Sequence, residues 1–395
     1  MNWANAAIFF AIIAGHCQLQ VMLVNRMHAV RLRCSTLRTW GRLHDVAMPL
    51  FPVLLVWLAG LGGPRLLLDG EWGDAAWGWW AVFAACGFGT VILARSTLRW
   101  SAARAPAALV SNHSTVVDVA ERLGTAPIGG GRTSFLARWP GNQVFQLEVN
   151  EKRVRHPRWP AAWNGLSILH VSDTHFCGPV DLPFFREVAE IASAERPDLV
   201  AFTGDLLDRR SLTSWLPETL GKILAPLGCY FVLGNHDWYL QPDEIRCALA
   251  ELGWVDVARR CASVPQEKLP DAPLRLTLAG DERPWMGGEA EFDGDRQQSF
   301  RLLLSHTPDN LPWARRNGVD LMLAGHIHGG QIVLPILGPI YAPSRYGTKY
   351  VSGLYWEHPT LLHVSRGVSG RLPLRWNCRP ELTKLVLESG GATGT

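Results

Sequence analysis

Asp173-Thr174-His175 is the first of five polar blocks that decide the fold of this chain. The other four are Gly204-Asp205, Gly234-Asn235-His236-Asp237, Ser305-His306 and Gly325-His326-Ile327-His328. Most of the blocks close a short apolar run, and these runs cover residues 167–171, 199–202, 230–233, 302–304 and 321–324. Runs of this length and content are typical of buried strands. The polar residues therefore fall at the carboxyl ends of strands, where open α/β sheets bind their ligands.

The side chains in these blocks suit a divalent metal ion. They are Asp, His and Asn with no Cys among them, a set that favours a borderline ion such as Mn, Fe or Zn. A structural zinc site would carry four Cys or His in paired short spacings instead. Two ions about 3.5–4 Å apart form a clamp for in-line attack of a bridging hydroxide on phosphorus, and such a pair needs one bridging carboxylate. Asp205 is the natural bridge because it lies in the middle of the series.

The five blocks, in this order and each after a plausible strand, resemble those of the calcineurin-like metallophosphoesterases over roughly residues 164–387. The resemblance implies an α/β (α+β) fold: a four-layer sandwich of two mixed sheets flanked by helices, with two divalent metal ions, Mn favoured, at one edge. The implied ligands are Asp173, His175, Asp205 and His328 for the first ion, and Asp205, Asn235, His306 and His326 for the second. His236 would protonate the leaving oxygen or hold the phosphoryl group, and Asp237 would orient its ring.

Three polar residues near the series have more ordinary interpretations. His170 lies inside an apolar run and is interpreted as a core residue. Asp208 either orients a ligand or stabilises its loop, and both roles remain open. Cys177 is interpreted as a small loop residue, because a dimetal enzyme already has its nucleophile.

Further stretches resemble the membrane-associated branch of this family: residues 160–168, His328-Gly329-Gly330-Gln331 and Ser365-Arg366-Gly367. That branch includes phosphodiesterases and the enzymes that hydrolyse UDP-2,3-diacylglucosamine in lipid A synthesis. The resemblance implies a phosphorylated, lipid-linked substrate cleaved at a pyrophosphate. The alternatives are a broad phosphodiesterase on nucleotides or phospholipid headgroups and, more distantly, an inactive membrane scaffold, which should have lost ligands.

Two groups of residues in the catalytic half could contact such a substrate. Arg345 and Lys349 could bind a diphosphate, or they could belong to a solvated loop. Of the 18 Trp residues, Trp285, Trp313 and Trp356 lie beside loops in this half. They could lie at the level of lipid headgroups, or they could be core residues.

The first 95 residues are a different kind of sequence. Residues 1–25, 46–64 and 75–94 carry no charged side chain, and a membrane-spanning helix needs about 20 predominantly apolar residues. Three spans are therefore predicted. His16, Gln18 and Gln20 in the first span would face other helices or a polar pathway.

The distribution of arginine predicts the orientation in the membrane. Residues 26–45 contain five Arg, whereas residues 65–74 contain one Arg against three acidic residues. Positive loops stay in the cytoplasm, and Arg95, Arg99 and Arg104 follow the third span on that side. We expect an integral protein of the inner or cell membrane with an outside amino terminus and a cytoplasmic catalytic domain.

Length and composition agree with a membrane-anchored enzyme. The 395 residues allow two or three domains, and the net charge of +3 without a basic stripe argues against a nucleic-acid polymer as partner. Membrane lipids are the expected partners, and the oligomeric state is not predicted. The eight Cys residues show no paired spacing, as expected for free thiols in a reducing compartment.

We expect three regions along the chain: a membrane region at 1–95, a connector at 96–163, and a metallophosphoesterase domain at 164–390. In the connector, residues 102–124 are predicted as a helix and residues 142–149 as a strand that joins the edge of the catalytic sheet. In the catalytic domain, helices are predicted at 182–195, 215–224 and 242–252. Later strands are predicted at 331–334, 349–356, 360–364, 371–376 and 383–387.

Overall fold

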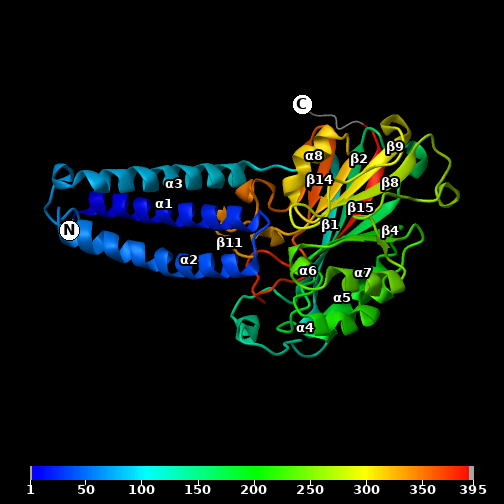
Figure 1. Ribbon diagram of the computed structural model, residues 1–395, viewed down its shortest axis with the longest axis horizontal. Coiled ribbons are helices and arrows are strands. Elements are labelled where there is room, and N and C mark those ends of the chain that lie inside the picture. Colours follow the sequence, from blue (N-terminus) through cyan, green and yellow to red (C-terminus); the bar gives the residue numbers. More distant parts are fainter. Residues whose placement is uncertain (1, 391–395) are drawn as a thin grey trace. The chain divides into compact units, whose positions relative to one another are not determined.

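The computed structural model describes residues 2–390, which form two units (Figure 1). The membrane unit contains the chain up to Ala103 and also Leu334–Lys349, which we call the return loop. The catalytic unit contains Arg104–Val333 and the chain from Tyr350 onward. The structure thus divides the chain differently from the three predicted regions, because most of the connector belongs to the catalytic unit.

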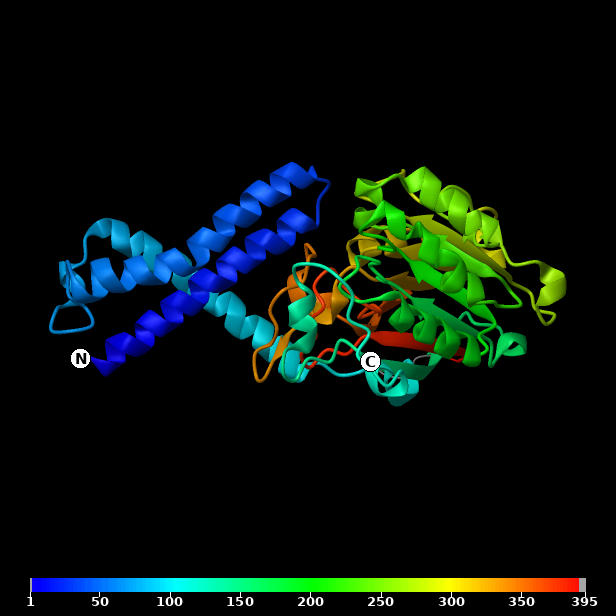
Figure 2. The same ribbon diagram turned by 90° about the horizontal axis from the view of Figure 1, so that it is seen from below.

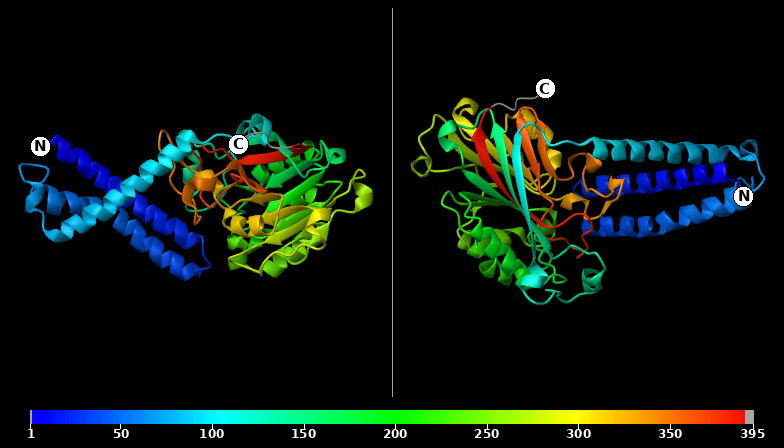
Figure 3. Two further views of the ribbon diagram at one scale, coloured as in Figure 1. Left: turned by 90° about the horizontal axis from the view of Figure 1, so that it is seen from above. Right: turned by 180° about the vertical axis from the view of Figure 1, so that it is seen from behind.

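The first sheet of the catalytic unit has seven strands in the described residues. Their order is β1 (Leu109–Asp118), β2 (Gln146–His156), β15 (Glu381–Ser389), β3 (Ser167–Val171), β4 (Leu199–Thr203), β5 (Cys229–Val232) and β6 (Val255–Asp256). Strands β3 to β6 are parallel, whereas β15 is antiparallel to β3 and β1 is antiparallel to β2. Figure 3 (right) shows β1, β2 and the red β15 side by side.

The second sheet has six strands in the described residues, and it is also mixed. Their order is β13 (Gly353–Glu357), β14 (Thr360–Val364), β10 (Leu321–Ala324), β9 (Ser299–Ser305), β8 (Arg275–Asp281) and β7 (Ala262–Ser263). Strands β8, β9, β10 and β14 are parallel, and β7 and β13 are antiparallel to their neighbours. The predicted pair of mixed sheets is therefore confirmed.

Alternating side chains of the seven-stranded sheet build two cores. Ile168 and Leu199 face the second sheet and pack in one cluster with Leu302 and Leu321. Their neighbours Leu169 and Val200 point to the opposite face, as the period of two along a strand requires. Because both faces are covered, these strands are mostly apolar, which makes them recognisable in the sequence.

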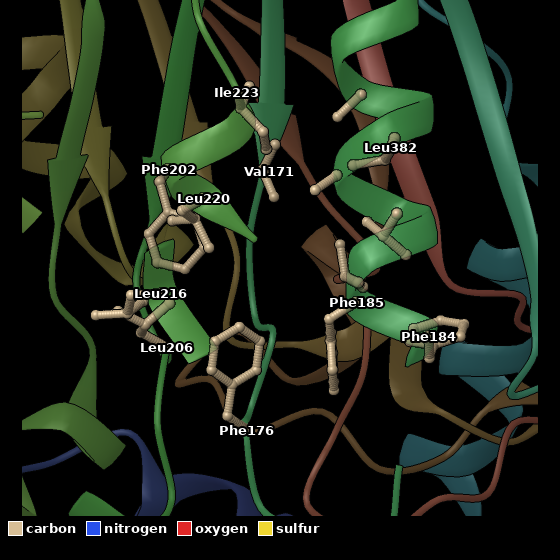
Figure 4. Packing of buried hydrophobic residues seen from close by; sticks show 14 of the residues in the cluster. Val171, Phe176, Phe184, Phe185, Phe202, Leu206, Leu216, Leu220, Ile223 and Leu382 are labelled. Carbon is tan, nitrogen blue, oxygen red and sulfur yellow. The ribbon is translucent and has the colours of Figure 1, made fainter. Parts of the chain in front are cut away.

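Helices cover the outer face of the first sheet (Figure 1). They are α4 (Val119–Arg122), α5 (Leu182–Ala194) and α7 (Pro242–Glu251). The short α6 (Asn235–Tyr239) carries the polar block that follows β5, and α8 (Leu311–Arg316) lies near β14 of the second sheet. The side chain of Asp181 caps the first turn of α5 by accepting from the Leu182 N–H. Figure 4 shows Phe185 of α5 between Phe176 and Phe184 in the resulting core.

The predicted helix at 102–124 is wrong. Residues 109–118 form β1, which pairs residue by residue with β2, and only Val119–Arg122 are helical. The β-branched residues Thr115, Val116 and Val117 favour a strand. The predicted strand at 142–149 exists as β2, but β1 and not β2 is the edge of the sheet.

Three other predicted elements also differ from the structure. Residues 215–224 contain parts of two 3₁₀ helices, Arg210–Glu218 and Leu220–Lys222, because Pro217 cannot donate within an α-helix. Residues 371–376 form no strand, and only Trp376 makes an isolated bridge, with Ile332. Of the predicted strand 331–334, only β11 (Val333–Leu334) forms, where the chain enters the return loop.

Within residues 2–390, three helices are long and apolar enough to cross a membrane: α1 (Trp3–His28), α2 (Cys34–Leu55) with its π-helical extension Val56–Leu61, and α3 (Trp77–Ala102). They share a small cluster that includes Phe9, Leu55 and Phe83. Outward-facing side chains such as Trp3, Phe10, Trp57 and Phe88 remain exposed. Exposed apolar residues on all sides are expected of helices in lipid. The return loop adds β12 (Gly338–Pro339) to this unit.

Candidate metal centre

The polar blocks meet because the strands that precede them are parallel neighbours. In the first sheet, Val171 at the end of β3 pairs with Phe202 near the end of β4. In the second sheet, Ala324 at the end of β10 pairs with Ser305 at the end of β9. The residues after these strand ends therefore converge on one edge of the sandwich, as the sequence predicts.

The first group that could hold a metal ion contains Asp173, His175, Asp205 and His328. The Nε2 atoms of His175 and His328 lie 3.1 Å apart. The Nε2 atom of His328 lies 3.5 Å from Asp173 Oδ1, and that of His175 lies 3.4 Å from Asp205 Oδ2. The side chains of Asp173 and His175 are almost completely buried.

A second group contains Asp205, His306 and His326. The Nε2 atom of His306 lies 3.3 Å from Asp205 Oδ2 and 3.1 Å from both His326 Nδ1 and Asn235 Oδ1. One oxygen, Asp205 Oδ2, thus reaches both groups. The structure brings together all seven residues that the sequence singles out as ligands.

The hydrogen bonds of the histidine rings show which nitrogens face the cluster with lone pairs. Nδ1 of His175 donates to Asp208 at 3.0 Å, Nδ1 of His306 to the Thr203 carbonyl at 2.7 Å, and Nδ1 of His328 to the Ser369 carbonyl at 3.1 Å. In the neutral rings, the three Nε2 atoms are therefore lone-pair donors aimed at carboxylate oxygens. Lone pairs and carboxylate oxygens that face each other repel, and a positive charge between them relieves this repulsion. The donor set therefore fits two divalent ions.

The raised pKa of His306 also indicates a site for cations. Burial lowers the pKa of this ring, but Asp205 and Asp173 outweigh burial and raise the pKa to about 9. A site that stabilises a proton on a buried histidine also stabilises a divalent cation.

The backbone at this edge is strained. Five of the ligand residues have a positive φ between 44° and 71°, although none is Gly: Asp173, His175, Asp205, His326 and His328. Left-handed backbone is uncommon for such residues and clusters at functional sites. The packing around the strand ends therefore holds the ligands in place at a conformational cost.

Two glycines let the loops approach closely enough. Gly204 has a φ of +95°, and a Cβ there would lie 2.7 Å from His306 Nδ1. A Cβ on Gly234 would lie 2.1 Å from Asp205 Oδ1. Any larger residue at Gly234 would therefore displace the shared carboxylate.

The predicted partner of His236 is wrong. The Nδ1 atom of His236 contacts Asp208 Oδ1 and not Asp237. Asp237 is fully buried and accepts from the backbone N–H groups of Leu206, Leu207 and Gly234 at 2.9–3.2 Å. Asp237 therefore shapes the loops, and Asp208, which also holds His175, orients the His236 ring.

His236 is open to a substrate. Its side chain is 22% exposed, whereas that of His175 is 1% exposed, and its Nε2 atom lies 4.0 Å from Asp205 Oδ2. Burial lowers the pKa of His236, but Asp205 and the hydrogen bond to Asp208 raise it to about 9. A ring that is protonated at neutral pH can donate a proton.

Two residues outside the predicted ligand set support the centre, and sequence reasoning missed this role for both. Arg375 is completely buried and donates to the carbonyl oxygens of His328 and Arg366 at 3.0 and 2.8 Å. Trp285 packs against the rings of His306 and His326, with centroids 5.5 and 4.9 Å apart. Neither residue belongs to a local pattern that could have revealed its role.

Four other residues named from the sequence are buried in the structure. Trp285 and Trp313 are buried and are core residues rather than headgroup contacts. His170 is also a core residue, because its ring nitrogens lie 2.8 Å from His363 Nδ1 and Thr203 Oγ1. Cys177 is buried, and burial raises the pKa of its thiol to about 12, in keeping with a small, unreactive loop residue.

The fold and the metal centre define a dimetal phosphoesterase, and the chain belongs to the calcineurin-like metallophosphoesterase family. The family model described as calcineurin-like phosphoesterase matches residues 166–330. The chain is 32% identical over 262 residues to the uncharacterized metallophosphoesterase YkuE of Bacillus subtilis, covering 62% of this chain and 87% of that protein. The predicted family and the predicted class of hydrolase are confirmed.

Two further relatives carry more specific names. Phosphodiesterase YaeI of Escherichia coli is 29% identical over 222 residues, covering 56% of this chain and 81% of that protein. UDP-2,3-diacylglucosamine pyrophosphatase LpxG of Chlamydia muridarum is 27% identical over 293 residues, covering 60% of this chain and 88% of that protein. The chain is thus similar both to a protein named as a phosphodiesterase and to one named as a pyrophosphatase.

Proposed function

We propose that this protein hydrolyses a phosphodiester or pyrophosphate bond in a lipid-linked substrate, with UDP-2,3-diacylglucosamine as the most concrete candidate. The observation that carries the reaction type is the single oxygen of Asp205 that reaches both groups of ligands, at 3.4 Å from His175 Nε2 and 3.3 Å from His306 Nε2. A shared carboxylate is what a pair of ions needs.

In this proposal, one ion is held by Asp173, His175, Asp205 and His328, and the other by Asp205, Asn235, His306 and His326. The two ions would supply Lewis acidity at the phosphoryl oxygens and activate water for in-line attack. Asp208 and the carbonyl oxygens of Thr203 and Ser369 fix the three histidine rings through their Nδ1 atoms. The ligand geometry is therefore set before a substrate arrives.

His236 donates the proton to the leaving oxygen. Asp208 accepts from its Nδ1, so Nε2 is left as the nitrogen of this partly exposed ring that can donate to a substrate. Asp205 also accepts from the His236 backbone N–H at 2.9 Å, which ties the position of the proton donor to the shared ligand.

The membrane unit supports a lipid-linked substrate. A soluble nucleotide would not require an enzyme with three apolar helices, whereas an acylated substrate lies in the membrane. We place the catalytic unit in the cytoplasm, since five Arg lie in residues 26–45. A fluorescent reporter fused after Thr395 should fluoresce, and phosphatase activity of a periplasmic reporter at that position would contradict this orientation.

A broad phosphodiesterase that acts on nucleotides or phospholipid headgroups is the second candidate, because one relative is named as a phosphodiesterase. A substrate panel distinguishes the two candidate functions. Full-length protein with Mn is assayed on acylated UDP-glucosamine, non-acylated UDP-sugars, a glycerophospholipid and a bis-aryl phosphodiester. We expect UMP release from the acylated substrate at the highest kcat/KM. A higher kcat/KM for nucleotides or glycerophospholipids would establish the second candidate instead.

A further inference from the structure

The membrane unit contains a polar pocket of its own. The pocket has a volume of about 170 Å³ and is lined by α1, α3 and the return loop. Its wall includes four arginines, Arg26 of α1, Arg95 and Arg99 of α3, and Arg345 of the return loop. None of the described residues that line it is acidic.

The pocket exists because α1 and α3 cross at small residues and then separate (Figure 2; Figure 3, left). A Cβ on Gly15 would lie 1.8 Å from the Cys86 carbonyl oxygen, and one on Gly89 would lie 2.2 Å from the Gly15 carbonyl oxygen. Glycine at both positions lets the two backbones touch. All of the helix residues that line the pocket come after this crossing in the sequence.

The return loop closes the space between the separated helices. The Ala342 N–H donates to Oδ1 of the buried Asn25 at 3.1 Å, which attaches the loop to α1. The hydroxyls of Ser96 and Thr348 lie 2.7 Å apart and attach the loop to α3. Asn25, Ser96 and Thr348 all line the pocket, so its polar wall is fixed by contacts within the unit.

The charge of the three helix arginines in the pocket is not balanced by carboxylates of the described residues. Within residues 2–390, no ion pair joins Arg26, Arg95 or Arg99 to an acidic side chain, and all three remain exposed. Three guanidinium groups around one pocket repel each other, and an anion that accepts their hydrogen bonds would relieve this repulsion. The pocket therefore has the chemistry of a phosphate site.

The position of the arginines in the sequence identifies the source of the phosphate. Arg26 is the first charged residue after the apolar stretch of α1, and Arg95 is the first after that of α3. Such residues lie at the level of the lipid headgroups. One helical turn earlier, Met22 and Ile92 line the same pocket on the side of the spans. Toward the spans the pocket is lined by Met22 and Ile92 beside one amide, Gln18, and at its other end by arginines. This arrangement matches an amphiphile with a phosphate head.

We propose that this pocket, the headgroup pocket, binds the phosphoryl group of an anionic membrane phospholipid. The site shares no residue with the metal centre, and it does not depend on which substrate that centre hydrolyses. The lipid would join α1, α3 and the return loop.

The test uses the full chain with Asp205→Asn, so that hydrolysis cannot consume the probe. Binding of soluble dihexanoyl phosphatidylglycerol is measured in neutral detergent by calorimetry, with inorganic phosphate as the second probe. Arg95→Gln/Arg99→Gln removes two charges from the pocket. Arg38→Gln/Arg42→Gln on α2 is the matched control, because it removes two exposed charges near the same end of the unit but outside the pocket. Thermal unfolding checks that both double variants are folded.

We expect the pocket variant to bind phosphatidylglycerol about 30-fold more weakly, from two arginine–lipid contacts, while the control changes the affinity less than about threefold. Equal losses of affinity in the two double variants would mean that general surface charge causes the effect, and the proposed pocket would be wrong. Inorganic phosphate that binds as tightly as phosphatidylglycerol would overturn the assignment to a lipid.

Discussion

In the metal centre the charged side chains are buried, whereas in the headgroup pocket they are exposed. Asp173, His175 and Asp205 are at most 1% exposed and lie on strained backbone, and their remaining polar atoms are hydrogen-bonded to the protein. Arg26, Arg95 and Arg99 lie on regular helices and are exposed. The function of the metal centre should therefore be lost when any one of its residues is replaced. Binding in the headgroup pocket should instead depend on the total charge of its arginines.

If the metal centre depends on individual buried charges, the largest effect on activity should come from Asp205→Asn. The change is nearly isosteric, but it removes the charge that both groups of ligands share. We expect activity to fall by about 1000-fold or more, and the content of Mn, measured by plasma mass spectrometry, to fall below two ions per chain. Two bound ions with normal turnover would show that Asp205 is no bridge.

His236→Ala should have the next largest effect. Loss of the proton donor should lower kcat by about 10²–10⁴-fold for a substrate with a poor leaving group, while both ions are retained. The loss should be smaller for a nitrophenyl ester, whose leaving group needs no proton. Equal losses for the two leaving groups would contradict proton donation and favour a role in holding the phosphoryl group.

The variants Asp208→Asn and Asp237→Asn should show which of the two carboxylates near His236 orients its ring. Because Asp208 holds the rings of His236 and His175, its replacement should lower kcat by about 10–100-fold. Asp237 accepts only backbone hydrogen bonds, so its replacement should lower the free energy of unfolding by about 1–3 kcal/mol. Denaturant unfolding and steady-state kinetics on both variants check this, and the reverse pattern would restore Asp237 as the orienting residue.

The smallest effect should come from a single charge in the headgroup pocket. Arg95→Gln should weaken the binding of dihexanoyl phosphatidylglycerol about fivefold, and Arg95→Gln/Arg99→Gln about 30-fold, because the charges act nearly independently. Calorimetry on the two variants measures both values. A single variant as weak as the double would mean that the pocket, like the metal centre, depends on one residue.

The sequence predicted the strands and the ligands because both follow from local patterns. The boundaries of β3, β10 and β14 coincide with predicted apolar runs, and parallel strand ends bring their polar neighbours together. The partner of His236 could not be predicted in this way. Whether Asp208 or Asp237 reaches the ring depends on the loop conformation after β4 and β5, and no periodicity encodes that conformation.

Other features depend on contacts between distant parts of the chain. Residues 109–118 become a strand because β2 pairs with them, although the pattern allowed a helix. Arg375 supports His328 from 47 residues away. The return loop belongs to the membrane unit through Asn25, which is 317 residues from Ala342 in the sequence. Long-range contacts of this kind leave no signal in a single sequence.

The return loop also has a consequence for any attempt to divide this protein. The chain passes between the two units three times: after Ala103, after Val333 and after Lys349. A protease cut after Ala103 would leave two covalent connections intact, and a truncated chain that begins at Arg104 would deprive the return loop of Asn25 and Ser96. The membrane helices are therefore not a detachable anchor, because they complete a segment that the catalytic half of the gene encodes.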